Sequence, residues 1–468
     1  MLIATATAVA QAAVEPALTV IPPGPVARGA QMELRLAVRN PAQTEKSARV
    51  AFFMDSESAA SMVGEQTISI PSGGRGLARV WCTANGPAGA HHVRYTVSTP
   101  GGEQKGAWPI EFVDSLTPTL PCLQGMWIEP LAVLGGATDS KPETLRNVVK
   151  DSVTAMDRLG VRVLILAYVE YLGHFFYPSG IEFFDGDVQR LSKGSDCSFD
   201  MVGAFLAEAD EHGMHVFLGL GRSGDTHLLW EFEKPDWDAR NTRALTISKN
   251  VADELWQKYG SHPSFYGWYL THEMNDLARA SAYYDPLARF CGSLAPEKPV
   301  LVAPAGTPLI TPALLASSAV DIFAYQDAVG AGYVPYQYTY KPERRIAMLE
   351  ECYKQYSAWH AKTGKHCWSD LELWEMDGSH GYGGSYPASF SRVKQQIDIA
   401  SRHTGMLTGY AYHGYLQAPG VTSEKPLPRA QKLYLDYAEY LQCLSLPETS
   451  RQEAPGPNTG GAGESPKE

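Results

Sequence analysis

The sequence predicts an α/β protein in which a (β/α)8 barrel, or TIM barrel, follows a small all-β immunoglobulin-like sandwich. Between residues 16 and 115, apolar residues recur at every second position in short segments separated by clusters of Gly, Pro and Ser. This alternation is typical of strands in a two-sheet sandwich. Between residues 118 and 445, an apolar strand, a polar turn and an amphipathic helix follow one another repeatedly, which is the pattern of a parallel barrel.

The barrel elements can be placed from hydrophobic periodicity. The first helix opens at Ser140 with Glu143 three residues later, the spacing of a capping box, and its apolar residues share one face. Strands are expected at about 123–128, 161–168, 215–220, 265–270, 299–303, 321–325, 366–373 and 406–412. Helices are expected at about 140–159, 199–212, 245–259, 277–293, 312–316, 342–362, 389–403 and 428–444.

A doubly wound open sheet is the alternative architecture for this alternation of strands and helices. Such a sheet normally carries a glycine-rich phosphate-binding loop directly after its first strand. Here the first strand runs into Trp127-Ile128-Glu129-Pro130, which contains no glycine. The sequence therefore favours the closed barrel.

The two ends of the chain are expected to lie outside both domains. Residues 1–15 form an apolar run of small residues with the A-x-A-like Ala10-Gln11-Ala12, which resembles a signal peptide without its basic start. This predicts a secreted or periplasmic protein. Residues 446–468 are rich in Pro, Gly, Ser and Glu and have almost no large apolar side chains, so this tail is expected to be disordered.

Composition argues against several classes of function. The formal net charge of -12 is opposite to the basic balance of a nucleic-acid binder. No apolar stretch reaches the roughly 18 residues that a membrane-spanning helix needs. The seven cysteines are scattered and lack metal-ligand spacing, so neither a metal nor another cofactor is expected.

Polar residues concentrate where predicted strands four, six, seven and eight end, and active sites of barrels lie at these carboxyl ends. Glu273 follows strand four and Glu372 ends strand seven, on opposite sides of the barrel mouth. Cleavage of a glycosidic bond needs two carboxyl groups, one to donate a proton and one to attack or to activate water. By analogy with retaining barrel glycosidases, Glu273 is predicted as acid/base and Glu372 as nucleophile. Asp370 points the same way as Glu372 along a strand and is the alternative carboxylate.

Other side chains near these strand ends are predicted to contact an oligo- or polysaccharide substrate. Aromatic rings stack on sugar faces, and polar groups bind hydroxyls. Each residue also has a plainer explanation, such as core packing, loop capping or, for Glu273, the first turn of a helix. The predicted contacts are Trp127, Tyr168, His272, Gln326, Asp327, Trp368, Asp370 and His413.

Several segments carry a resemblance to a known family. The motifs are Lys258-Tyr259-Gly260 with His262–Glu273, then Gly213–Leu220, Gln326–Gly330 and Trp368–Glu372. They resemble a bacterial family of glycoside-hydrolase-like barrels that is labelled a domain of unknown function. The resemblance covers most of residues 120–440 and implies a catalytic glutamate at position 273. The chain differs in having Asp370 where an amide is expected, and its charge would shift the pKa of the partner carboxylate.

Two other functions remain open from the sequence. A metal-dependent hydrolase or deacetylase would use His272, Glu273, Asp370 and His413 as ligands, although neither HxH nor HExxH occurs. A glycan-binding barrel without catalysis would keep the cleft and lose the chemistry. The depth of any pocket is expected to depend on the long loops 171–197, 221–243 and 328–341.

Overall fold

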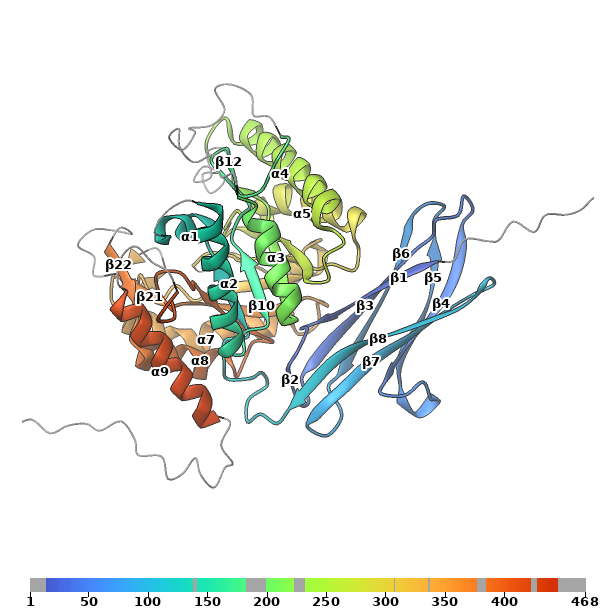
Figure 1. The fold of residues 1–468 in the computed structure, drawn as a ribbon, viewed down its shortest axis with the longest axis horizontal. Coiled ribbons are helices and arrows are strands. Elements are labelled where there is room, and N and C mark those ends of the chain that lie inside the picture. Colours follow the sequence, from blue (N-terminus) through green and yellow to red (C-terminus); the bar gives the residue numbers. More distant parts are fainter. Residues whose placement is uncertain are drawn as a thin grey trace, which may run out of the picture.

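The computed structural model describes residues 14–137, 141–181, 199–222, 232–306, 308–335, 337–376, 384–421 and 427–444. Eight N-terminal strands gather on one side of the molecule, and a ring of strands and helices lies beside them (Figure 1). The predicted tail at 446–468 and nearly all of the predicted leader at 1–15 lie outside the described residues. Their expected properties therefore stay predictions.

The N-terminal strands form two sheets that share one apolar core. Leu34, Leu36 and Val38 alternate along β3 and are fully buried in this core, as the period of two predicts. The sheets have the orders β1-β3-β6 and β2-β8-β7-β4-β5, so the predicted two-sheet sandwich is present, while its immunoglobulin-like character stays a prediction. The strands are β1 (Glu15–Ile21), β2 (Val26–Ala27), β3 (Gln31–Arg39), β4 (Lys46–Met54), β5 (Met62–Ile70), β6 (Arg75–Thr83), β7 (Gly89–Thr99) and β8 (Gly102–Val113).

The second part is a closed barrel of eight parallel strands, so the predicted TIM barrel is confirmed and the open-sheet alternative is wrong. β23 pairs with β9, which closes the ring. The strands are buried along almost their whole length, as expected of strands covered on both faces. They are β9 (Gly125–Ile128), β10 (Val163–Leu166), β13 (His215–Gly219), β15 (Phe265–Tyr269), β16 (Val300–Val302), β17 (Ile322–Gln326), β20 (His366–Glu372) and β23 (Leu407–Tyr410).

Helices surround the barrel and bury one apolar face each. In α2, Leu145, Val148, Val149 and Val153 form that face, as predicted. The predicted cap Ser140 lies outside the described residues, and the helix starts with Pro142 after Lys141. The helices are α2 (Pro142–Arg158), α3 (Met201–His212), α4 (Trp237–Tyr259), α5 (Leu277–Leu294), α6 (Pro312–Ser317), α7 (Pro342–His360), α8 (Phe390–Ala400) and α9 (Pro428–Leu444).

Two features of the helices differ from the sequence prediction. A short helix, α1 (Pro130–Gly136), follows β9 where no helix was predicted, and Pro at its first position suits a helix start. α4 begins at Trp237 rather than near residue 245, because its first two turns are mostly polar and carry little periodicity.

Within the described ranges, no helix combines the length and the apolar character that crossing a membrane requires.

The sandwich docks on the amino-terminal end of the barrel strands. The Trp108 ring stacks on His215 at the start of β13, with ring centroids 5.3 Å apart. Near the start of β15, the Tyr266 hydroxyl donates a hydrogen bond of 2.7 Å to the carbonyl of Val20. Ile21 of β1 even belongs to the barrel's own apolar core. The sandwich therefore covers the end of the barrel opposite to the one where strand-end chemistry is expected.

A buried charge network joins the two parts. Arg35 of β3 donates to Glu33 at 2.8 Å and to Asp321, the residue before β17, at 2.6 Å. His366 at the start of β20 lies 2.8 Å from Glu33, and Arg79 also contacts Glu33 at 2.5 Å. Burial alone would raise the pKa of Glu33, but the hydrogen bond with His366 and the charge of Arg35 hold it well below its usual range. The buried charge of Glu33 is therefore stabilised by the side chains that contact it in this interface.

Candidate active site

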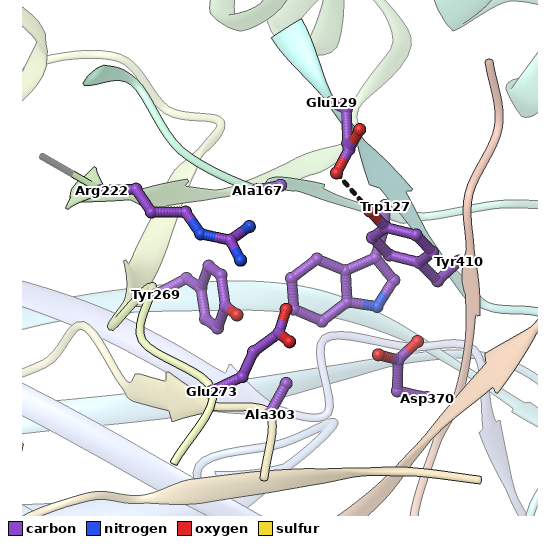
Figure 2. Close-up of a pocket in the computed structure, with 9 residues that line it drawn as sticks. All are labelled: Trp127, Glu129, Ala167, Arg222, Tyr269, Glu273, Ala303, Asp370 and Tyr410. Atoms are coloured by element: carbon purple, nitrogen blue, oxygen red, sulfur yellow. Dashed lines mark hydrogen bonds between the residues drawn. The ribbon is translucent and has the colours of Figure 1, made fainter. Parts of the chain in front are cut away.

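A pocket lies at the carboxyl-terminal end of the barrel, where the loops after the strands converge. Its empty space is about 260 Å³, including the part open to solvent. All the barrel strands except β17 supply lining residues, either directly or through the segment that follows them. The lining consists of Trp127, Glu129, Ala167, Arg222, Tyr269, Glu273, Ala303, Asp370 and Tyr410 (Figure 2).

Glu273 lies four residues beyond the end of β15, on a segment that is held firmly. The Leu270 amide donates to the carbonyl of Leu301 at 3.0 Å, and the Thr271 hydroxyl donates to the carbonyl of Gly221 at 2.7 Å. The Glu273 carboxylate points toward the middle of the pocket beside the indole of Trp127 (Figure 2). Among the described residues it has no hydrogen-bond or ion-pair partner, so it is free to meet a ligand.

Asp370 enters the same pocket from β20, where it pairs with Gln326 of β17 and Thr408 of β23. Its side chain is almost fully buried, and its Oδ1 atom has no hydrogen-bond partner in the described part of the chain. Burial, and then the charges of Asp327, Glu372 and Glu273, raise the pKa of Asp370 well above its ordinary value. The surroundings of Asp370 therefore favour its protonated form.

Glu129 is a third carboxyl in the pocket, and aromatic rings separate it from Asp370 (Figure 2). The Tyr410 hydroxyl donates a hydrogen bond to Glu129, whose pKa is raised chiefly by burial. The Trp127 ring packs edge-on against Tyr269, with centroids 4.7 Å apart. The pocket thus combines carboxyl groups with flat apolar walls, a lining that suits a sugar ring.

Arg222 supplies positive charge to the lining and comes from the two-residue strand β14 (Gly221–Arg222). β14 pairs in parallel with β11 (Glu170–Tyr171), which in turn pairs with β12 (His174–Phe175). Burial acts to lower the pKa of Arg222, but the charge of Glu273 and nearby tyrosine hydroxyls raise it overall. The guanidinium is therefore charged, and it faces the middle of the pocket (Figure 2).

Glu372, the sequence-predicted nucleophile, is not in the pocket lining. Its Oε2 atom accepts a hydrogen bond of 2.5 Å from the Gly330 amide, and its backbone amide donates to Asp327 at 3.2 Å. Gln396 and Arg392 of α8 donate to Asp327 and to the Glu372 carbonyl, respectively. Burial raises the pKa of both carboxyls, and for Glu372 the charge of Asp327 adds to this effect. The two form a buried carboxyl pair that ties β20 to the loop after β17.

This buried pair predicts a pH-dependent stability difference. A folded-state pKa above the unfolded value means that the folded protein keeps a proton that the unfolded chain releases. The stabilisation that such a group contributes is fully present below the ordinary carboxyl pKa of about 4.3. It is lost as the pH rises toward the pKa of the group in the folded protein. Glu372→Gln should therefore become progressively more stable relative to wild type from pH 5 to pH 8, measured by urea unfolding.

The difference between the two proteins reports the Glu372 carboxyl together with its effect on the neighbouring carboxyls of Asp327 and Asp370. The expected slope is up to about 1.4 kcal/mol per pH unit. Glu351→Gln, at an exposed position of α7, is the control and should follow wild type at every pH. A constant difference between Glu372→Gln and wild type would show that Glu372 does not retain a proton on folding.

Of the other predicted site residues, Trp127 and Asp370 line the pocket, together with Glu273. Tyr168 packs on Tyr171, with ring centroids 5.0 Å apart, and Trp368 is fully buried edge-on to Phe217. None of the remaining predicted contacts is in the lining, and their roles toward a substrate stay predictions. They are Tyr168, His272, Gln326, Asp327, Trp368 and His413.

The two histidines of the metal-site alternative are buried apart from the lining. His413 lies 3.0 Å from the Ser152 hydroxyl, and the His272 ring packs edge-on to Tyr283 at 5.0 Å. Burial lowers the pKa of each histidine to about 3, so both are neutral. Within the described ranges, no group of three or more His, Cys, Asp or Glu side chains is arranged to hold a metal ion.

Sequence reasoning did not select four polar or aromatic residues that line the pocket. Tyr269 and Tyr410 end β15 and β23, so their positions at strand ends could have marked them. Glu129 lies two residues after Trp127, a spacing that returns to the same side of an extended chain. Arg222 follows a Gly-Leu-Gly segment, and no local pattern indicates where its side chain points.

Comparisons with known proteins agree with the barrel. A solved structure from Bacteroides thetaiotaomicron, provisionally assigned as an α-L-fucosidase, matches with a TM-score of 0.51 and 17% identity over 69% of this chain and 93% of that one. The endo-β-1,4-mannanase from Thermotoga petrophila matches with a TM-score of 0.47 and 13% identity over 68% and 76%. The model of a family described as a domain of unknown function (DUF4434) matches residues 124–423. No curated protein matches the sequence.

Proposed function

The chain belongs to the DUF4434 family of domains of unknown function, and we propose that it is a glycoside hydrolase acting on an oligo- or polysaccharide. One observation carries the proposal: Glu273 and Asp370 face the same pocket from β15 and β20 (Figure 2). These strands are three steps apart in a ring of eight, so the two carboxyls approach from nearly opposite sides. Such a pair is what hydrolysis of a glycosidic bond requires.

The surroundings of the two carboxyls support a division of roles. Asp370 is buried, lacks a partner for Oδ1 and lies near other carboxyls, so it can donate a proton to the leaving oxygen. Glu273 faces the Arg222 guanidinium and is the group that attacks the anomeric carbon. This division reverses the one that strand position alone predicts. Attack by a carboxylate gives retention of configuration, the outcome we propose.

The contacts of Glu372 favour Asp370 as the second carboxylate. The Glu372 side chain is held by the Gly330 amide, whereas Asp370 lines the pocket. Glu372 stays the alternative that the sequence predicts, and variants decide between the two. The glycan-binding alternative would use the same pocket, and it differs by showing no turnover.

Asp370→Ala tests the role of proton donor. Hydrolysis of glycosides with poor leaving groups should fall by about 10²–10⁴-fold, because no group protonates the departing oxygen. Hydrolysis of 2,4-dinitrophenyl glycosides should fall far less, because this leaving group departs without a proton. The measurement is kcat/KM over a panel of aryl glycosides that differ in leaving-group pKa.

Two matched variants make this test decisive. Glu372→Ala should lose activity equally for good and poor leaving groups, or lose none, because its carboxyl lies outside the pocket lining. If Glu273→Ala shows the leaving-group dependence instead, Glu273 is the donor and the proposed division of roles is wrong. If none of the three variants changes turnover, the pocket is not the catalytic site.

A further inference from the structure

Arg222 presents an unsatisfied charge to the pocket. Its side chain is mostly buried, and its guanidinium faces the space between Glu273 and Glu129 (Figure 2). Neither carboxylate lies within the 4.0 Å of an ion pair, and no described residue accepts a hydrogen bond from the guanidinium. Leaving such a group without acceptors in a largely desolvated site is costly. A ligand group that accepts these donors would remove that cost.

The backbone that carries Arg222 is fixed before any ligand arrives. Gly221 pairs with Glu170 of β11, and its carbonyl accepts the hydrogen bond from Thr271. A Cβ atom at position 221 would lie 2.8 Å from the Glu170 carboxylate, so a larger residue here would require that side chain to shift. Arg222 therefore extends from a paired strand, and little ordering is needed when a ligand binds.

The acidic residues around Arg222 do not fully balance its positive charge, so the pocket can accept one more negatively charged group. Glu129 accepts a hydrogen bond from the Tyr410 hydroxyl, and burial favours the protonated form of Asp370. Glu273 is then the remaining carboxyl that faces Arg222. A neutral hydroxyl would use only one donor of the planar guanidinium. A carboxylate or a sulfate can accept hydrogen bonds from two of its donors and also balance its positive charge.

We propose that Arg222 binds an anionic substituent of the substrate sugar, a carboxylate or a sulfate, while the glycosidic oxygen lies between Glu273 and Asp370. This proposal rests on the glycosidase function proposed above and names its substrate class. The aromatic rings of Trp127 and Tyr269 lie between Arg222 and Asp370, where the sugar ring would stack (Figure 2).

The test measures binding to the full-length protein by calorimetry. The probes are glucuronate, galacturonate and mannuronate, the 6-sulfates of glucose and galactose, and the parent neutral sugars. At least one anionic sugar should bind about 10-fold or more tightly than its neutral parent, which corresponds to the gain from a charge-assisted bidentate contact. Comparison of the uronates with the sulfates identifies which anion the site prefers.

Variants assign that preference to Arg222. Arg222→Gln should abolish the preference for the anionic sugar, and Arg222→Lys should restore part of it through charge alone. Arg279→Gln is the control, because Arg279 is exposed and pairs with Glu233 rather than with a pocket residue. The proposal is overturned if no anionic sugar binds more tightly than its parent, or if Arg222→Gln weakens neutral and anionic sugars equally.

Failure of this inference differs from failure of the glycosidase proposal. If neutral glycosides are cleaved as fast as anionic ones, the enzyme is a glycosidase and Arg222 does not select the substrate. If an anionic sugar binds through Arg222 but no glycoside is cleaved, the binding site stands and the catalytic proposal falls.

Discussion

Glu273→Gln is expected to lower kcat for glycoside hydrolysis by about 10³-fold or more, because an amide neither attacks an anomeric carbon nor takes up a proton. The replacement keeps the shape of the side chain. Glu273 also has no hydrogen-bond partner among the described residues, so the fold should be unaffected. Initial rates and the melting temperature of the same samples measure the two effects separately.

Azide distinguishes attack by Glu273 from a role as base. Glu273→Ala leaves space in the pocket, and added azide should restore turnover by forming a glycosyl azide of inverted configuration relative to the substrate. The configuration is read by NMR. If Glu273→Gln keeps full activity while Glu372→Gln loses it, the nucleophile is the residue that strand position predicts.

Arg35→Ala is expected to destabilise the protein by about 3–5 kcal/mol, the cost of removing one partner from a buried ionic network. The variant removes the buried cation that bridges Glu33 and Asp321 and leaves them only the half-buried Arg79, 2.5 Å and 3.7 Å away. The measurement is urea unfolding at pH 7, followed by tryptophan fluorescence and by circular dichroism. Because the chain has two parts, both signals are needed to separate their transitions.

Arg39→Ala is the matched control on the same strand. Its ion pair with Glu15 is 2.9 Å long but exposed on both sides, so its loss should cost no more than about 1 kcal/mol. Equal midpoints for Arg35→Ala and Arg39→Ala would contradict the structural importance of the network. A shift confined to one of two transitions would show which part depends on the contact.

The barrel could be predicted because its strands and helices bury continuous apolar surface. β13, β15 and β20 begin at the expected residues, and β13 and β15 are short, largely apolar runs bounded by polar turns. α4 was predicted too short, because a helix start without apolar periodicity leaves no pattern to detect. The family match agrees with the resemblance drawn from the motifs, while the individual motifs remain untested.

The site was harder to predict than the fold. Alternation along a strand places residues 370 and 372 on one side, so the sequence could not choose between them. Both residues pair with β23, but the Asp370 side chain lines the pocket, whereas the Glu372 carboxylate accepts a hydrogen bond from the Gly330 amide. Arg222 could not be selected, because its direction depends on the pairing of β14 with β11, which are far apart in sequence.

The docked sandwich also limits how far the chain can be shortened from its N-terminal side. The match to the family begins at residue 124, yet Asp321 and His366 inside that region contact Arg35 and Glu33 outside it. Shortening the chain to the matched segment would expose Asp321, His366 and the apolar surface that packs against Ile21 to water. The N-terminal sandwich is thus part of the base of the barrel rather than a separable domain, and shortened versions should be designed to retain it.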